Sequence, residues 1–347
     1  MKHVLNSELR EGMILGQDVF DRNMVLFLAS GTILTGQHIR ALSNMDVAVV
    51  AIVEKFSEDG QTQPLIIEDR LATEYKRSVE NFKAIFKETR IGKKLVHEEL
   101  DACVAPLLEA ISDNNNIAKR LWQIESCDEY TYDHSVQVCM IAALLGKWLG
   151  YKDKELKAIA VAGLLHDIGK INIPDEILNK PVELNEEEFR IMKTHATLGY
   201  VLLMNNKDFD DETLMAVLQH HESYDGSGYP NGLKGKDISR YARIITIADV
   251  YSAMISDRIY RKRRSPFEVA RIIMDSTFGC FDPYYSMIFL NKISQFYVGN
   301  IVKLTTGEIG EVVMIPKNEP ARPLVKVEDR FVDLLKTMDV EIEEIIF

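Results

Sequence analysis

Five of the eight histidines in this 347-residue chain fall within one segment, and two aspartates accompany them. One aspartate directly follows a histidine in HDIGK, and the other stands inside the apolar run ITIADVYSAM. Burying an unpaired carboxylate costs more than a fold gains from it, so such an acid is usually paired, and a metal ion is a natural partner. The candidate ligands are His134, His166, Asp167, His195, His220, His221 and Asp249.

These ligand types indicate both the metal and the chemistry. Imidazoles and carboxylates without thiolates suit iron, manganese, zinc, cobalt or nickel rather than calcium. Seven ligands are too many for one ion, whereas two ions that share a carboxylate use that number well. Centres with two ions about 3.5–4 Å apart serve phosphoryl chemistry. A single histidine on an apolar helix face is more often a core residue, but five at helix ends or on apolar faces favour a metal site.

Composition excludes several other classes of protein. The four cysteines show no regular spacing, which argues against a disulfide framework and against a cysteine zinc site. The charged N-terminus does not resemble a signal peptide, and no apolar run approaches the ~20 residues of a membrane span, so a cytoplasmic protein without a membrane partner is expected. A formal charge of −12 opposes binding of DNA or RNA, although RIYRKRR concentrates five basic residues in seven.

Apolar patterning divides the chain into four parts and predicts a mainly α protein. Residues 121–296 carry apolar stripes at helical spacing, including one continuous helix over 185–205, and several stretches begin with Asn, Asp or Ser at a plausible N-cap. An all-α domain of at least five helices is therefore predicted there. Residues 1–65 predict a small α/β unit and residues 297–347 a small β unit. Residues 66–120 predict two amphipathic helices, a connector that is a candidate for pairing with a second chain in a homodimer.

Several of these motifs together resemble a known family. HDIGK at 166–170, the isolated His134, and HHESYDGSGYP followed by ADVYSAMISDRIYR are similar to the HD-GYP family of cyclic di-GMP phosphodiesterases, a branch of the HD metal-dependent phosphohydrolases. The resemblance extends from about residue 128 to residue 290. It implies an HD-type helical domain that binds two divalent transition metals, with iron or manganese favoured over zinc, cobalt or nickel. It also implies hydrolysis of cyclic di-GMP to linear pGpG by a metal-bridging hydroxide, with further cleavage to GMP left open.

The resemblance also assigns roles to individual residues. Asp167 bridges the two ions. The first ion is held by His134, His166, Asp167 and Asp249, and the second by His195, His220 and His221 in addition to the bridge. Lys170 faces a phosphate and shares the catalytic role with Asp167. Gly226, Gly228, Tyr229 and Pro230 form the loop that names the family, in which glycines bring the backbone close to a ligand that Tyr229 contacts.

Two arginines of the basic run complete the predicted substrate site. Arg258 and Arg261 follow Asp249 by nine and twelve residues, so a helix from Arg243 onward would bring them to the rim of the metal site. The arginine fork matches phosphate oxygens.

The sequence departs from the family pattern at two positions. Some members carry a glutamate that holds a third metal where this chain has Tyr130, so a two-metal site is favoured. The family often has DVYDA where this chain has DVYSA, and the replacement of an acid by Ser252 bears on activity or proton transfer. Two alternatives to cyclic di-GMP hydrolysis stay open. One is a cyclic di-GMP-binding module without turnover, and the other is an HD hydrolase of another nucleotide such as cyclic GMP-AMP.

Overall fold

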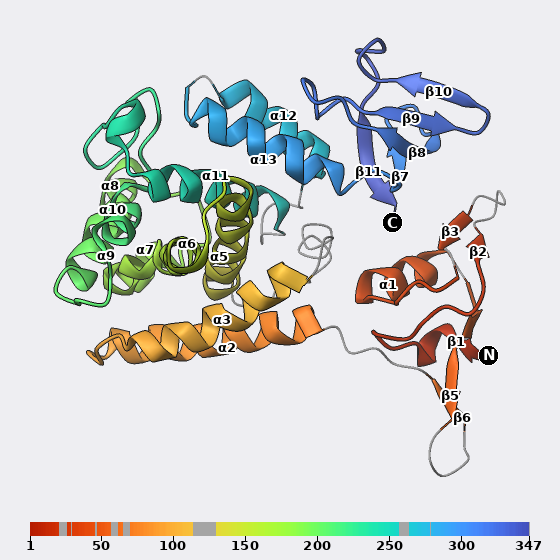
Figure 1. Ribbon diagram of the computed structural model, residues 1–347, viewed down its shortest axis with the longest axis horizontal. Coiled ribbons are helices and arrows are strands. Elements are labelled where there is room, and N and C mark those ends of the chain that lie inside the picture. Colours follow the sequence, from red (N-terminus) through yellow and green to blue (C-terminus); the bar gives the residue numbers. More distant parts are fainter. Residues whose placement is uncertain are drawn as a thin grey trace.

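The computed structural model describes residues 1–20, 26–28, 30–45, 47–56, 62–64, 70–113, 130–256, 264–277 and 279–346. Helices dominate these residues, and small sheets lie near both ends of the chain (Figure 1). The predicted mainly α class is therefore confirmed. Within the described ranges, no helix has both the length and the apolar character that a membrane span requires.

Three helices that pack against one another form the centre of the helical body. Helix α5 (Tyr130–Trp148) packs against α6 (Asp153–Leu165) and α11 (Arg240–Ile255). All ten residues 136–145 of α5 are buried, and Gln137 is the polar one among them. A helix that is apolar on almost all sides is one that its neighbours surround. Helix α10 (Asp211–Gln219) contacts α6, α11 and α9 (His195–Leu203), and α9 in turn contacts the 3-10 helix η2 (Ile168–Asn172).

Side-chain caps begin several of the helices, at Asn185 and Ser239 where the sequence predicts them. The Asn185 side chain accepts a hydrogen bond from Glu188 N before α8 (Glu186–Lys193), and the Glu188 carboxylate accepts one from Asn185 N, which completes a capping box. Similar caps precede α10, α11, α12 (Pro266–Ser276) and α13 (Pro283–Gln295), provided by Asp210, Ser239, Ser265 and Asp282. Short helices α7 (Asp175–Leu178) and η3 (Gly235–Asp237) complete this part of the chain.

The single helix predicted over 185–205 is in fact two helices, α8 and α9, which meet at Thr194. The Thr194 hydroxyl donates to Ile191 O at 2.6 Å, and His195 Nδ1 lies 2.7 Å from Met192 O. Side-chain donors thus compete for carbonyls that a continuous helix would use, which favours a break. The break makes His195 the first residue of α9.

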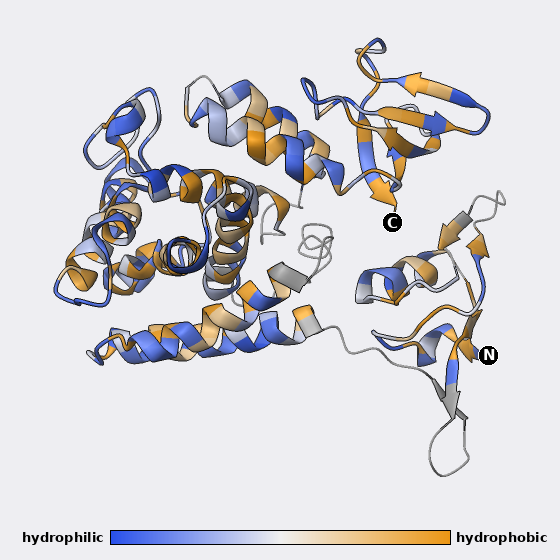
Figure 2. Ribbon diagram, viewed as in Figure 1, coloured by the Kyte–Doolittle hydropathy of each residue, from blue (hydrophilic) through white to orange (hydrophobic). Residues whose placement is uncertain are grey.

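The predicted pair of connector helices is present as α2 (Arg70–Arg90) and α3 (His97–Asp113). Both carry hydrophilic and apolar residues (Figure 2). They pack against each other and against α5, and the apolar side chains of Tyr75, Phe82 and Leu100 are fully buried. The chain's own helices therefore cover the apolar stripe that suggested a second chain. A homodimer through residues 66–120 stays a prediction.

Small sheets stand at both ends of the chain. Near the N-terminus three pairs of antiparallel strands are present: β1 (Lys2–Leu5) with β4 (Val49–Ile52), β2 (Val19–Phe20) with β3 (Leu26–Leu28), and β5 (Glu54–Phe56) with β6 (Thr62–Pro64). The same part of the chain contains the 3-10 helix η1 (Asn6–Glu8) and the helix α1 (Gly36–Asn44). Near the C-terminus five antiparallel strands lie in the order β10-β9-β8-β7-β11. These strands are β7 (Ile301–Leu304), β8 (Ile309–Met314), β9 (Leu324–Val327), β10 (Arg330–Asp333) and β11 (Ile342–Ile346).

Two apolar cores lie behind these elements. The N-terminal strands and α1 enclose their own core, which includes Leu15, Leu42 and Ile52. A second core runs without interruption from α2 and α3 through the helical body into the C-terminal sheet. Ile346 of β11 packs against the N-terminal core. The division at residues 65, 120 and 296 stays a proposal, because the second core crosses two of these boundaries.

Phe82 provides a test of how much the connector contributes to stability. We expect Phe82→Ala to lower the free energy of unfolding by about 3–5 kcal/mol, because the change leaves a cavity in the shared core. Urea denaturation measures this change. Phe331→Ala is the matched control, since its ring is 62% exposed and its loss should cost within about 0.5 kcal/mol. Equal losses in the two variants would show that α2 is not part of the cooperative core.

Candidate metal centre

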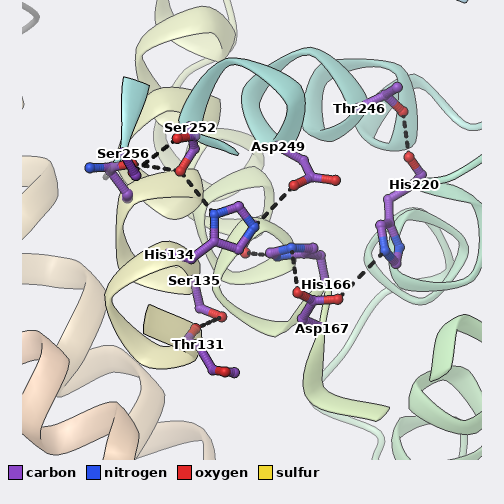
Figure 3. Close-up of polar contacts among 12 residues, drawn as sticks. Thr131, His134, Ser135, His166, Asp167, His220, Thr246, Asp249, Ser252 and Ser256 are labelled. Atoms are coloured by element: carbon purple, nitrogen blue, oxygen red, sulfur yellow. Dashed lines mark hydrogen bonds and ion pairs between the residues drawn. The ribbon is translucent and has the colours of Figure 1, made fainter. Parts of the chain in front are cut away.

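The fold brings together all seven predicted ligands from five places in the sequence. Figure 3 shows His134, His166, Asp167, His220 and Asp249. Four of the seven, Asp167, His195, His220 and His221, form one group whose ligand atoms lie within 4.8 Å of one another. His134, His166 and Asp167 form a second group within the same limit. Asp249 joins the second group, since its Oδ1 lies 3.0 Å from His134 Nε2. Asp167 therefore belongs to both groups.

Helix ends orient three of the histidines. His166 follows α6, His195 follows α8, and His220 follows α10. In each case Nδ1 lies 2.7–2.8 Å from the carbonyl oxygen three residues earlier, contributed by Gly163, Met192 and Val217. A carbonyl only accepts hydrogen bonds, so Nδ1 carries the proton and the lone pair of the neutral ring lies on Nε2. This is the arrangement typical of histidines that bind metal through Nε2.

The Nε2 atoms and the carboxylate oxygens of the centre face one another. His195 Nε2 lies 3.2 Å from Asp167 Oδ1 and 3.2 Å from His220 Nε2. His166 Nε2 lies 3.3 Å from Asp167 Oδ2 and makes no hydrogen bond. Lone pairs that face lone pairs in a buried site repel unless a cation lies between them. The donor set therefore fits a divalent metal ion of the kind that imidazoles and carboxylates bind.

Burial keeps most of the imidazoles neutral. It lowers the pKa of His134 and lowers that of His220 well below the ordinary value, where the neighbouring histidines add to the effect. Burial also lowers the pKa of His221 to about 4. The pKa of His166 is raised instead, because the carboxylate of Asp167 outweighs the effect of burial. Neutral imidazole is the form that binds a metal ion.

The two aspartates stay ionised. Burial alone would raise the pKa of Asp167, but the charge of Lys170 and the interactions with His166 hold it well below its usual range. Burial alone would likewise raise the pKa of Asp249, but its closeness to His134, whose Nε2 lies 3.0 Å from Oδ1, holds it below the usual range. Both carboxylates are thus acceptors near neutral pH, as metal ligands must be.

Lys170 lies beside Asp167. Its Nζ is 2.5 Å from Asp167 Oδ2, and its side chain is 23% exposed. The lysine belongs to η2, so the 3-10 turn rather than an α-helical turn sets its direction. An ammonium group here stands at the edge of the cluster with access to solvent.

The loop from His221 to Pro230 packs on itself and supports the second group. The ring of Tyr229 stacks on His221 with 4.7 Å between centroids. A Cβ on Gly228 would lie 2.2 Å from Ser223 N, and one on Gly226, where φ is +86°, would meet the Lys234 side chain. The glycines thus let the loop's own backbone and a neighbouring side chain come close, and the expectation that they also bring the backbone close to a ligand stays a prediction.

A buried glutamate fixes the far end of the same loop. Glu222 accepts from Asn231 N at 2.7 Å and from Leu233 N at 3.0 Å. The Tyr229–Pro230 peptide bond is cis, and Pro230 is exposed. Ligand contacts of Tyr229, Pro230 and Gly228 stay predictions.

Sequence reasoning missed a close helix contact that joins the two groups. A Cβ on Gly169, within HDIGK, would lie 1.9 Å from His195 O and 2.4 Å from Gly199 N. Only glycine lets η2 approach α9 this closely, and the approach brings Asp167 next to His195. The sequence carries one signal of this contact, which is the presence of Gly169 and Gly199 within apolar stretches of helical spacing.

The predicted arginine ligands Arg258 and Arg261 lie outside the described residues. The helix that was expected to carry them ends at Ile255, and the backbone of Ser256 is extended, with φ −91° and ψ 143°. The helical offset from Asp249 is therefore the wrong basis for placing them, and their role stays a prediction. Tyr130 is the first residue of α5, but its side chain also falls outside what the structure describes.

Fold and site together define a helical domain built around a buried histidine and aspartate cluster. The sequence profile of the family described as HD domain matches residues 111–284, and this chain belongs to the HD domain family. The resemblance to the HD-GYP branch is confirmed by curated relatives. One of them, the cyclic di-GMP phosphodiesterase PA4108 of Pseudomonas aeruginosa, is 34% identical over 244 residues, which cover 70% of this chain and 59% of that protein.

Two further proteins extend the comparison. The 3'3'-cGAMP-specific phosphodiesterase 1 of Vibrio cholerae is 36% identical over 186 residues, 53% of this chain and 42% of that protein. The solved structure of Bd1817, a HDG"Y"P protein from Bdellovibrio bacteriovorus, aligns with this chain at a TM-score of 0.53 and 19% identity. The alignment covers 83% of this chain and 97% of that one, so the two share a fold. The chain spans less than two thirds of the length of both curated relatives.

The histidine environments predict how stability depends on pH. His134, His220 and His221 have folded pKa values below the ~6.5 of an unfolded chain, so the unfolded state binds more protons and stability falls as pH drops from about 6.5 towards 4. His166, whose pKa is raised, acts in the opposite direction but is one group against three. We therefore expect chelator-treated protein to melt at a lower temperature at pH 5.0 than at pH 7.5 by scanning calorimetry.

A His221→Gln variant serves as the control for this pH dependence. It removes one of the three groups and should reduce the difference between the two melting temperatures. An equal or higher melting temperature at pH 5.0 in the parent protein would contradict the burial of neutral imidazoles.

Proposed function

We propose that the protein is a phosphodiesterase that uses two divalent transition metals, iron or manganese, to hydrolyse cyclic di-GMP to linear pGpG. The observation that carries the proposal is the convergence of lone pairs from seven buried or nearly buried ligands, arranged as two groups that share Asp167. The names of curated relatives, which are phosphodiesterases of cyclic dinucleotides, support the substrate class.

Asp167 is suited to bridging two ions. Its Oδ1 faces His195 at 3.2 Å and His220 at 4.0 Å, and its Oδ2 faces His166 at 3.3 Å. The first ion would be held by His134, His166, Asp167 and Asp249, and the second by Asp167, His195, His220 and His221. When bound, two such ions lower the pKa of water to near neutrality and offset the charge on phosphoryl oxygens.

Other residues of the chain would orient and neutralise the substrate. The Lys170 ammonium adds a positive charge at the edge of the site, where it can turn from Asp167 to a phosphate oxygen. The almost complete burial of His166, His195 and His220 excludes bulk water, which strengthens every charge interaction at the reacting phosphate. Tyr229 holds the His221 ring in place by stacking.

Cyclic GMP-AMP is the second candidate substrate. The Vibrio cholerae relative is named as specific for 3'3'-cGAMP and is 36% identical to this chain over 186 residues. The metal cluster would serve either dinucleotide equally, because the reacting phosphodiester is the same. A module that binds cyclic di-GMP without turnover is the non-enzymatic alternative.

Metal analysis combined with product chromatography tests the proposal. Protein purified anaerobically should contain about two iron or manganese ions per chain and should convert cyclic di-GMP to pGpG faster than it converts cyclic GMP-AMP. Asp167→Ala, which removes a ligand of both groups, should abolish turnover and lower the metal content. One ion or none after reconstitution would refute the two-metal centre, and binding without product would favour the non-enzymatic module.

Lys170→Ala separates phosphate binding from metal binding. We expect the variant to keep its metal and to lose about tenfold or more in kcat/KM, because a charge-assisted contact of about 1.5–3 kcal/mol is lost. Lys180→Ala is the matched control, since Lys180 Nζ also lies 2.5 Å from a carboxylate oxygen, that of Glu188, and its side chain is 24% exposed. If both variants were as active as the parent protein, Lys170 would have no role at the phosphate.

A further inference from the structure

We propose that Ser252 and Gln137 are positioning residues that keep the proton of His134 on Nδ1 and thereby set the affinity of the ion next to His134 and Asp249. The inference deepens the proposed function and rests on it, because it concerns one half of the same metal centre. It assigns a role to the serine at which this chain departs from the family pattern.

His134 differs from three of the other histidines in where it stands on its helix. His166, His195 and His220 follow helix ends, where the carbonyls three residues earlier are available to Nδ1. His134 lies within α5, where main-chain carbonyls are used by the helix itself. Its Nδ1 instead lies 3.0 Å from the hydroxyl of Ser252 on α11 (Figure 3).

The hydroxyl is part of a buried chain of polar side chains. Ser252 Oγ donates to Gln137 Oε1 at 2.6 Å, and Ser256 Oγ lies 2.9 Å from the same oxygen. The exposed fractions of Ser252, Gln137 and Ser256 are 0%, 3% and 3%. Gln137 follows His134 by three residues on α5, and Ser252 follows Asp249 by three on α11, so each positioning residue lies on the same helix face as a ligand.

The direction of this hydrogen-bond chain decides which nitrogen of His134 can bind a metal. A hydroxyl has one proton, and when it goes to the amide oxygen of Gln137 the serine oxygen accepts from Nδ1–H, which leaves the lone pair on Nε2. If the serine proton turned to Nδ1, the ring proton would move to Nε2 and point at Asp249 Oδ1, 3.0 Å away. A carbonyl partner of Nδ1 would exclude that reversal, because a carbonyl can only accept. The Ser252 hydroxyl can donate or accept, so Gln137 must fix the direction by accepting the serine proton.

Chelator competition on metal-loaded protein tests the proposal. Ser252→Ala should weaken the binding of one of the two ions by about 10–100-fold, since loss of a hydrogen-bond partner of a metal ligand typically has that cost. The affinity for the other ion should stay within about twofold of the parent value. Ser252→Thr retains the hydroxyl and should behave as the parent protein does. Ser135→Ala is the matched control, because Ser135 is equally buried beside His134 but donates to Thr131 O at 3.1 Å.

Gln137 variants test the direction of the chain. Gln137→Leu removes the acceptor and should weaken binding of the same ion that Ser252→Ala affects. Gln137→Glu keeps an acceptor and should retain the parent affinity for that ion. In zinc-loaded protein labelled with ¹⁵N-histidine, the Nδ1–H signal of His134 should exchange slowly with water in the parent and Ser252→Thr proteins and rapidly in Ser252→Ala. A purely structural role for the serine would not change this exchange selectively.

The outcomes separate this inference from the proposed function. A parent protein that holds fewer than two ions overturns both. Two ions in the parent protein, with Ser252→Ala indistinguishable from Ser135→Ala, overturn the positioning role alone. Equal weakening of both ions by Ser252→Ala would also overturn it, because the change would then act on the whole fold rather than on His134.

Discussion

The constraint on which the rest of the structure depends is the repulsion among lone pairs gathered in one buried place. The Nε2 atoms of His195 and His220 lie 3.2 Å apart, and those of His166, His195 and His220 lie 3.2–4.0 Å from the oxygens of Asp167, where water cannot screen them. Such an arrangement is costly for an apolar core and favourable only around cations. The close contact of Gly169 with α9 and the stacking of Tyr229 on His221 hold the groups in place against this repulsion.

Helix termination has a chemical role in this fold. Where α6, α8 and α10 end, carbonyl groups lose their main-chain donors, and the histidine that follows each end supplies its Nδ1–H instead. The same hydrogen bond therefore satisfies the helix end and selects the ring nitrogen that faces the centre. His134, inside α5, lacks that arrangement and depends on side chains of α5 and α11.

The connector helices lie directly against the elements that carry the centre. Tyr75 of α2 donates its hydroxyl proton to Asp133 Oδ1 at 2.9 Å, next to His134, and α2 also contacts η2, which begins after Asp167. One continuous apolar core connects α2 and α5 with the C-terminal sheet. Packed interiors transmit small displacements because they contain few voids, so the position of α2 bears on the geometry of His134.

The sequence by itself determined the mainly α class, the helix caps at Asn185 and Ser239, and the seven candidate ligands. These depend on local propensity and on residue chemistry, which need no distant partner. Only the tertiary structure decided that the helix over 185–205 breaks at Thr194, that α11 ends before Arg258, and that Gly228 packs against its own loop. It also decided the partner of His134, because Ser252 lies 118 residues away and the two meet only where α5 crosses α11.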